Sequence, residues 1–170
     1  MILVDSSVWI SFLNGVNSAE AAFLAASIAE DRPLTIPGLV RTEVLLGART
    51  DADALRMSRS LSAYPLVPEA APADYEQAAA IYRTCRGRGY TIRSAIDCLI
   101  ARLCLRDGYE LLAKDRDFDA IGSAFPLRRV PVRLMVHEPG IRYATQNGRA
   151  RRRLSQDPPR RAHGDHGSGT

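Results

Sequence analysis

Short apolar runs alternate with longer, helix-patterned stretches along most of the chain. The run Ile2-Leu3-Val4 contains no polar position, which is typical of a strand buried on both faces, and Asp5-Ser6-Ser7 after it can cap a helix. Further short strands are predicted at 34–36, 66–67, 109–113 and 130–135. Further helices are predicted at 19–31, from Pro37 to Gly47, and at 51–62, 72–86 and 94–107. This alternation predicts an α/β fold in which helices cover a mainly parallel sheet.

The composition changes toward the C-terminal end of the chain. Residues 142–170 carry seven Arg and two Asp, a net charge of +5, whereas residues 1–141 carry a net charge of −1. The basic pI of about 9.2 therefore belongs to the C-terminal segment and not to the body of the protein. Because this segment has few apolar residues to offset the entropy of ordering it, we expect one compact domain at 1–141 and a disordered basic tail at 142–170.

Several classes of protein are excluded by the same composition. Three cysteines without regular spacing form neither a disulfide framework nor a zinc-finger pattern. The apolar N-terminal run has no basic residues before it and is interrupted at Asp5, which excludes a signal peptide. No run reaches the roughly 18–20 apolar residues of a membrane span. We therefore expect a cytoplasmic protein in a reducing compartment.

Acidic residues follow two of the predicted strands. Asp5 follows the first strand directly, and Asp115 and Asp117 follow the strand that contains Leu111. Because ligands of open parallel sheets bind beyond the carboxyl ends of the strands, these three side chains are expected on one rim. Asp5 is equally well explained as the N-cap of the next helix, and capping can coexist with metal binding.

A further carboxylate, Glu43, lies on a predicted helix. Helical geometry places it at the apolar face beside Val40 and Leu46. Burial of an unpaired carboxylate costs several kcal/mol, so a cation or a strong hydrogen-bond donor is expected to meet it there. The alternative is a salt bridge with Arg41 or Arg49.

Asp97 lies in the first turn of the predicted helix 94–107. It is three residues after Ser94, so the two residues resemble a capping box, which is a purely structural explanation. Asp97 also lies beside Ile100 and Cys104, at the edge of the apolar stripe of that helix. This second position would bring its carboxylate close to the rim of the sheet.

Carboxylates that converge need a counter-charge. Two of them about 4 Å apart repel each other by roughly 4 kcal/mol at an effective dielectric constant near 20. A group of three or four is therefore stable only when it is protonated or binds cations. Because an all-carboxylate site suits hard cations that prefer oxygen ligands, the sequence predicts Mg²⁺, or else Mn²⁺, as the cofactor.

Four segments of the chain carry a family resemblance. They are Ile2-Leu3-Val4-Asp5-Ser6-Ser7-Val8-Trp9-Ile10, Thr42-Glu43-Val44-Leu45, Asp97-Cys98-Leu99-Ile100-Ala101 and Leu111-Leu112-Ala113-Lys114-Asp115-Arg116-Asp117-Phe118. In this order and at these spacings, within about residues 1–136, they resemble the PIN-domain ribonucleases. The resemblance is closest to the VapC toxins of bacterial VapBC toxin–antitoxin pairs.

The resemblance implies a three-layer α/β/α fold with a mainly parallel central sheet, whose acidic rim binds Mg²⁺ and hydrolyses RNA phosphodiester bonds. It also implies a cognate VapB-like antitoxin that blocks the site, and often a homodimer. The positions that match the acidic quartet of the family are Asp5, Glu43, Asp97 and Asp115. Ser7 matches the small hydroxyl residue that supports the first Asp, and Asp117 is an alternative to Asp115 as the fourth acid.

The proposed chemistry follows from the charges. Asp5 and Asp97 are expected to bind Mg²⁺, with Glu43 and Asp115 completing its coordination or binding its waters, so that a bound water attacks the phosphodiester. Such an acidic pocket repels RNA unless cations flank it. The residues expected to contact RNA are Arg83, Arg86, Arg88 and Arg93, with Tyr90 among them. Arg83, Arg86 and Arg88 are equally explained as residues that favour a helix C-terminus and solvate a loop.

Two other functions remain open on the sequence. A phosphohydrolase of the haloacid-dehalogenase kind also places an Asp after its first strand, but it needs a second Asp two residues later, where this chain has Ser7. A metal-free module that binds RNA or protein would need the acids only for structure. Stabilisation by Mg²⁺ or Mn²⁺ would distinguish a metal enzyme from such a module.

Overall fold

The computed structural model describes residues 1–132, so the basic segment 142–170 and residues 133–135 of the last expected strand lie outside the described residues. The elements in chain order are β1 (Ile2–Val4), α1 (Ser6–Leu13), α2 (Ala19–Ala29), β2 (Leu34–Thr35), α3 (Gly38–Leu46), α4 (Asp51–Leu61), α5 (Pro72–Gly87), α6 (Ala95–Asp107), β3 (Glu110–Leu112) and α7 (Asp117–Ala124). None of these helices is long and apolar enough to cross a membrane.

The three strands form one parallel sheet in the order β2-β1-β3. Ile2 pairs with Leu34 on one side and with Glu110 on the other. Single parallel bridges join Ile36 to Leu66 and Leu111 to Arg129, and these extend the pairing at both edges. The predicted parallel sheet is therefore confirmed, with the central strand nearest the N-terminus.

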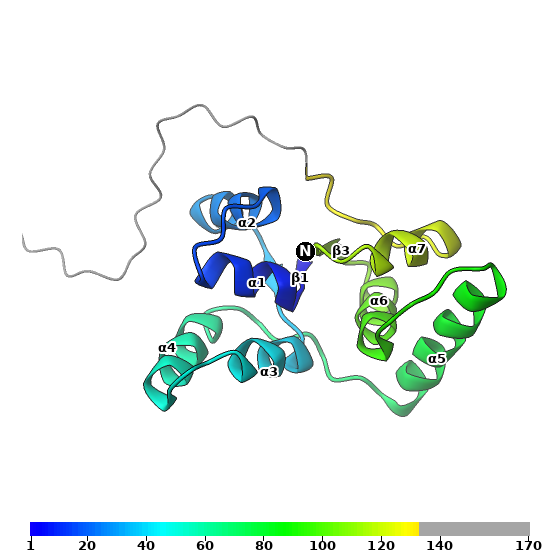
Figure 1. Cartoon of the computed structure of the whole chain (residues 1–170), viewed down its shortest axis with the longest axis horizontal. Coiled ribbons are helices and arrows are strands. Elements are labelled where there is room, and N and C mark those ends of the chain that lie inside the picture. The colour runs from blue at the N-terminus through cyan, green and yellow to red at the C-terminus, as the bar shows by residue number, and fades with distance from the viewer. Residues whose placement is uncertain (133–170) are drawn as a thin grey trace, which may run out of the picture. The chain divides into compact units, whose positions relative to one another are not determined.

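The helices surround the sheet in two groups (Figure 1). α1 packs on α2 and α3, and α3 packs on α4, whereas α5, α6 and α7 contact one another and α6 also contacts β3. All three residues of β1 are buried, as their uninterrupted apolar pattern predicted. The sheet thus lies between helices, in agreement with the expected α/β/α arrangement.

A network of charged residues joins the start of α5 to α6. Asp74 is buried and accepts hydrogen bonds from Arg102 Nε at 2.9 Å and from Arg106 Nη1 at 2.6 Å. Its carboxylate also accepts the main-chain N–H of Ala71 at 3.0 Å, which closes the first turn of α5. These donors, of which Ala71 has the largest effect, lower the pKa of Asp74 below its ordinary value. The network fixes the register between the two helices.

The sequence pattern did not predict helix α7. Its eight residues follow directly on the acidic segment, and Phe118 and Ile121, one turn apart, are fully buried. This short i, i+3 pair was the only apolar signal, and such short segments are easily assigned to a loop. A strand was also expected from residue 130. In the described part of the chain, only a single bridge between Arg129 and Leu111 is formed there.

Candidate active site

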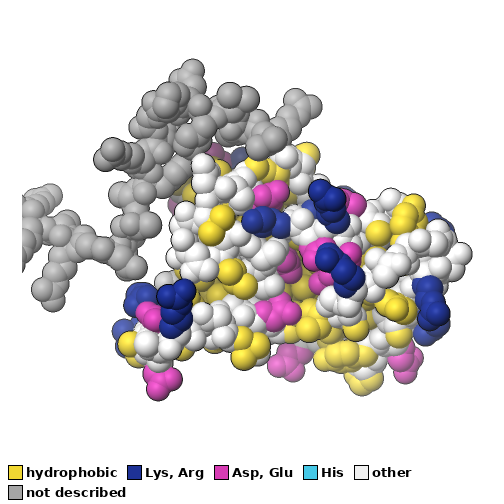
Figure 2. Space-filling model, in the orientation of Figure 1, with side chains coloured by type: hydrophobic (Ala, Val, Ile, Leu, Met, Phe, Trp, Pro, Cys, Tyr) yellow, Lys and Arg dark blue, Asp and Glu magenta, His cyan; other side chains and the backbone are white. Residues whose placement is uncertain are grey.

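The ends of two adjacent strands define the rim. The main-chain N–H of Asp5 donates to Leu112 O at 2.9 Å, so the residue after β1 is bonded to the last residue of β3. Asp115 and Asp117 follow β3 within a few residues, and Asp117 begins α7. The parallel pairing therefore places acids from two strands at the same edge, as expected. On the face shown in Figure 2, acidic and basic side chains lie next to each other.

Asp5 has the structural role that was considered for it. It is the N-cap of α1, and its Oδ2 accepts the main-chain N–H of Ser7 at 3.0 Å and the Ser7 hydroxyl at 2.5 Å. Ser7 Oγ in turn accepts the main-chain N–H of Lys114 at 3.3 Å, from the segment that follows β3. No residue in the described part of the chain donates to Asp5 Oδ1. This oxygen is therefore available to a cation while the other one caps the helix.

Asp97 lies in the first turn of α6, where Ser94 is the N-cap. Ser94 Oγ accepts the main-chain N–H groups of Ile96 at 3.1 Å and Asp97 at 3.4 Å. The reciprocal bond of a capping box, from the Ser94 N–H to the Asp97 carboxylate, is not formed between these two described residues. The Asp97 carboxylate is therefore not occupied in capping α6 and can interact with the other acids.

Burial and repulsion both act on Asp97. Desolvation, followed by the negative charges of Asp5, Asp115, Asp117 and Glu43, raises the pKa of Asp97 to about 7. The acids expected at the rim are thus close enough to affect one carboxylate electrostatically. Without a cation, Asp97 binds a proton near neutral pH.

Three of the acids meet closely. One carboxylate oxygen from each of Asp97, Asp115 and Asp117 lies within 4.8 Å of the other two. Asp5 and Glu43 are not part of this close group, although their charges act on Asp97. The structure thus brings together two members of the expected quartet with the alternative acid Asp117, and it places the other two members farther away.

Asp115 and Asp117 have different surroundings. Asp117 is buried, and its Oδ2 accepts the main-chain N–H of Arg93 at 2.7 Å. Asp115 is partly exposed, and its Oδ1 accepts the main-chain N–H of Asp117 at 2.9 Å and Arg93 Nη2 at 2.7 Å. Asp117 is thus anchored by the main chain, whereas Asp115 has more freedom to turn toward a ligand.

Glu43 is half-buried on α3, at a distance from the close acidic group. Neither Arg41 nor Arg49 forms an ion pair with it: Arg41 Nη2 instead donates to Ser58 Oγ at 2.9 Å, on α4. The expectation that Leu46 would be buried on the same face was wrong, because Leu46 is 79% exposed. Leu46 is the last residue of α3, and the buried residues of this helix are Val40 and Val44.

The arginines expected to contact RNA separate into two kinds. Arg86 and Arg88 are exposed near the end of α5, and Arg88 Nη1 donates to Ala124 O at 3.3 Å. Arg93, in contrast, directs its guanidinium to the acids, and the charges of Asp115 and Asp117 raise its pKa. The pairing of Arg93 with the acids was not visible in the sequence because the partners are more than twenty residues apart.

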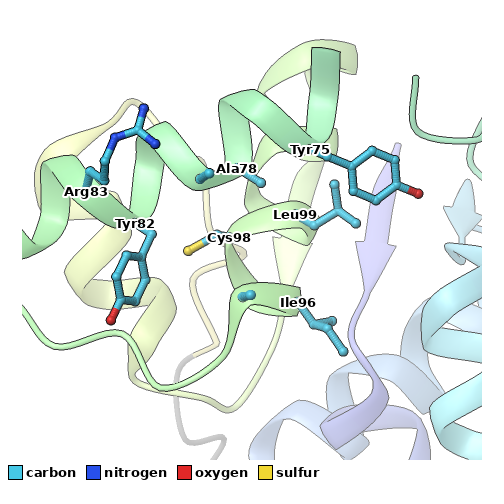
Figure 3. A pocket seen from close by; sticks show the side chains of 9 residues that line it. Tyr75, Ala78, Tyr82, Arg83, Ile96, Cys98 and Leu99 are labelled. Carbon is cyan, nitrogen blue, oxygen red and sulfur yellow. The ribbon is translucent and has the colours of Figure 1, made fainter. Parts of the chain in front are cut away.

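An apolar groove of about 570 Å³ lies between α5 and α6. It begins near Ile96, the neighbour of Asp97, and two tyrosines and an arginine stand along it (Figure 3). The residues that line it are Tyr75, Ala78, Ala79, Tyr82, Arg83, Ala95, Ile96, Cys98 and Leu99. The molecule therefore presents an apolar surface next to the acidic group, which the sequence did not predict.

The donor set fits a divalent cation. It consists of carboxylate oxygens, which are the ligands that Mg²⁺ and Mn²⁺ prefer, and it contains no thiol or imidazole. Burial raises the pKa of Asp97 most, and the negative charges of the neighbouring acids, which a bound cation would offset, raise it further. Exposed acids are common on proteins, but a half-buried carboxylate among four others has no comparable structural explanation.

Comparison with known proteins agrees with this geometry. Residues 2–124 match the PIN domain family. VapC ribonuclease Mb1587 of Mycobacterium bovis is 31% identical over 134 residues, which span 78% of this chain and 100% of that protein. Ribonuclease VapC11 of Mycobacterium tuberculosis is similar to the same extent.

Solved structures share the fold at lower sequence identity. The crystal structure of VapC20 of Mycobacterium tuberculosis, described as a sarcin–ricin-loop-cleaving toxin, has a TM-score of 0.56 and 23% identity, covering 72% of this chain and 95% of that one. FitAcB of Neisseria gonorrhoeae has a TM-score of 0.54 and 20% identity, covering 72% and 94%. With the family match and the full-length similarity to curated relatives, the chain belongs to the PIN-domain family, in the group of the VapC ribonucleases.

Proposed function

We propose that this protein is a Mg²⁺-dependent endoribonuclease and the toxin component of a type II toxin–antitoxin system. The observation that supports this most strongly is the approach of Asp97, Asp115 and Asp117 to within 4.8 Å at the rim of a PIN fold. Names of the curated relatives support RNA as the substrate. The chemistry of the donor set supports Mg²⁺, with Mn²⁺ as a substitute.

The carboxylates would hold the cation from several elements at once. We assign Asp5, Glu43, Asp97 and Asp115 as its ligands, directly or through water, with Asp5 offering Oδ1 and Asp97 losing its proton on binding. When bound, Mg²⁺ lowers the pKa of a coordinated water and neutralises charge on the attacked phosphate. Ser7 holds Asp5 in one rotamer through the 2.5 Å hydrogen bond. No protein nucleophile is required.

Positive charge near the acids would guide the RNA. Lys114 directly precedes Asp115, and its ammonium group donates to Ser11 Oγ at 3.0 Å, which fixes a cation one residue from the acidic group. Arg86 and Arg88, which precede Asp97 in the sequence, are exposed and can contact RNA phosphates. Exchange of Arg86 and Arg88 for Gln should weaken RNA binding and its salt dependence, while unchanged binding would support a purely solvating role.

Family membership also supports the partners expected for a toxin. We propose that a VapB-like antitoxin covers the acidic site, that the chain forms a homodimer, and that both act in the cytoplasm, where the RNA is. A search of the DNA beside this gene for a small reading frame that encodes a DNA-binding protein tests for the antitoxin. Co-expression of that protein with this chain, followed by light scattering of the purified complex, would then test the binding and the oligomeric state together.

The alternative functions receive less support. In a haloacid-dehalogenase-type phosphohydrolase, a second Asp would stand where Ser7 donates to Asp5, so Ser7 cannot supply the acid–base group of that chemistry. A metal-free binding module would gain nothing from a carboxylate whose pKa is raised to about 7, first by burial and then by the neighbouring acids. Both alternatives predict no RNA cleavage.

Cleavage of RNA by the purified full chain tests the proposal. We expect fragmentation of a mixed RNA substrate with Mg²⁺, none with EDTA, and a loss of at least about a hundredfold in Asp97→Asn. Asp53→Asn, which changes a partly exposed acid paired with Arg56 on α4, is the matched control and should cleave normally. Full activity of Asp97→Asn would show that the assignment is wrong.

A further inference from the structure

Arg93 contributes two kinds of contact to the acidic group. Its guanidinium donates from Nη2 to Asp115 Oδ1 at 2.7 Å and from Nε to Asp117 Oδ1 at 3.3 Å. Its main-chain N–H donates separately to Asp117 Oδ2 at 2.7 Å. The side chain therefore supplies positive charge, whereas the main chain supplies an N–H donor that any residue except proline would retain at this position.

The guanidinium uses oxygens that a cation would need. Asp97, Asp115 and Asp117 form the close carboxylate group, and Arg93 contacts two of the three. Asp115 Oδ1 already accepts from both Arg93 and the main-chain N–H of Asp117. A divalent cation on the same oxygens would lie a few ångströms from the guanidinium, where like charges repel strongly. The guanidinium and the divalent cation therefore cannot both bind these carboxylates as tightly as either would alone.

The contact between Arg93 and Asp115 is the one that can be exchanged. The side chain of Arg93 is 68% exposed and that of Asp115 is 36% exposed, so either can turn into solvent without opening a cavity. Asp117 is 9% exposed and stays bonded to the main chain of residue 93. Loss of the Arg93 side chain would therefore remove charge without removing the anchor of Asp117.

We propose that Arg93 is an internal counter-cation, which stabilises the acidic group in the metal-free protein and competes with the divalent cation for Asp115. This inference rests on the proposed metal-dependent function. With Arg93 present, the site then binds the divalent cation more weakly than the same carboxylates would bind it without Arg93. Occupancy would then follow the concentration of the free divalent cation.

Mn²⁺ binding to the purified full chain, measured by isothermal titration calorimetry after removal of metal with EDTA, tests this role. We expect Arg93→Gln to bind Mn²⁺ about threefold to tenfold more tightly than the wild-type chain. Arg93→Lys retains the charge and should bind nearly as the wild-type chain does. Arg56→Gln also loses one arginine and one ion pair with an Asp, on α4, and should leave the affinity unchanged.

Thermal unfolding provides a second readout. In EDTA, Arg93→Gln should melt at a lower temperature than the wild-type chain, because the acids lose their counter-charge, and Mn²⁺ should raise its melting temperature by more. An arginine with only a structural role would lower the melting temperature equally with and without Mn²⁺.

The outcomes separate this inference from the proposed function. If the wild-type chain binds Mn²⁺ but Arg93→Gln binds it equally or more weakly, the competition is refuted and the metal site stands. Equal gains in Arg93→Lys and Arg93→Gln would also refute it, since charge would then not matter. If neither the wild-type chain nor any variant binds Mn²⁺, both the competition and the proposed metal chemistry are refuted.

Discussion

The hydroxyl of Ser7 donates to Asp5 Oδ2 at 2.5 Å. Asp5 is the residue that directly follows the central strand β1. The same oxygen accepts the Ser7 main-chain N–H, so two donors from one residue fix the Asp5 carboxylate. The carboxylate thus caps α1 through Oδ2, while Oδ1 accepts no hydrogen bond from the described residues. A single serine thereby connects helix capping to the orientation of a candidate metal ligand.

Ser7→Ala should separate these two roles. The main-chain hydrogen bond to Asp5 remains in the variant, so the free energy of unfolding should fall by only about 1 kcal/mol. Loss of the hydroxyl frees the Asp5 rotamer and should weaken Mn²⁺ binding by about tenfold. Chemical denaturation and calorimetry measure the two effects. Ser6→Ala, at the adjacent position of α1, is the control; equal metal affinity in both variants would contradict the role given to Ser7.

Asn substitutions should distinguish Asp115 from Asp117. Asp117 is buried and anchored by the Arg93 main chain, so Asp117→Asn should mainly lower the melting temperature. Asp115 is partly exposed, so Asp115→Asn should leave the melting temperature nearly unchanged but weaken metal binding and RNA cleavage. The reverse pattern, with activity lost only in Asp117→Asn, would identify Asp117 as the fourth acid.

The metal-free protein should lose stability as the pH rises. The pKa of Asp97 is raised from 3.8 to about 7 in the folded state, so the folded chain binds a proton there that the unfolded chain has released. This contribution is fully present below about pH 3.8 and disappears as the pH rises through about 7. Mg²⁺ should oppose the loss, because it replaces the proton.

Thermal unfolding in EDTA measures this effect, with Asp97→Asn as the reference that cannot titrate. The melting temperature of the wild-type chain should fall relative to that of Asp97→Asn between about pH 5 and pH 8. A constant difference between the two proteins over this range would mean that Asp97 titrates normally. The comparison cancels the titration of the groups that do not interact with Asp97.

Asp74 should affect stability without affecting the site. Asp74→Ala removes the partner of Arg102 and Arg106 and the cap of α5, so its melting temperature should fall by several degrees. Asp53→Ala, which breaks an exposed pair with Arg56, should cause a smaller change. Because the pKa of Asp74 is lowered from 3.8, its contribution should be fully present above about pH 3.8 and should be lost as the pH falls through the lowered pKa. A loss of Mn²⁺ affinity in folded Asp74→Ala would contradict this separation.

The main elements could be predicted from the sequence because their signals are local. The apolar run before Asp5 and the periodic pattern of α6 predicted the central strand and the helix that carries Asp97. The short helix α7 was missed because only Phe118 and Ile121 signal it. The basic segment 142–170 and its boundary with the domain lie beyond the described residues and stay a prediction.

The acids were predictable individually, but their relationships were not. Asp5 and Asp115 follow strands, and strand order brings their ends together, which sequence reasoning can anticipate. The ion pairs of Arg93 depend on how the loop before α6 packs against the segment after β3, and no local pattern records this. The same holds for Glu43: the salt bridge with Arg41 that was the alternative explanation for this acid does not form, and Arg41 contacts Ser58 instead.

We propose that a metal-activated water hydrolyses RNA at the acidic rim, and mass spectrometry of the RNA fragments formed in ¹⁸O-labelled water with Mg²⁺ tests this directly. We expect one solvent-derived oxygen in each new terminal phosphate, and no fragments with EDTA or with Asp97→Asn. Fragments that carry 2′,3′-cyclic phosphates, or that form equally in EDTA, would contradict it, because the 2′-hydroxyl and not a metal-activated water would then be the nucleophile.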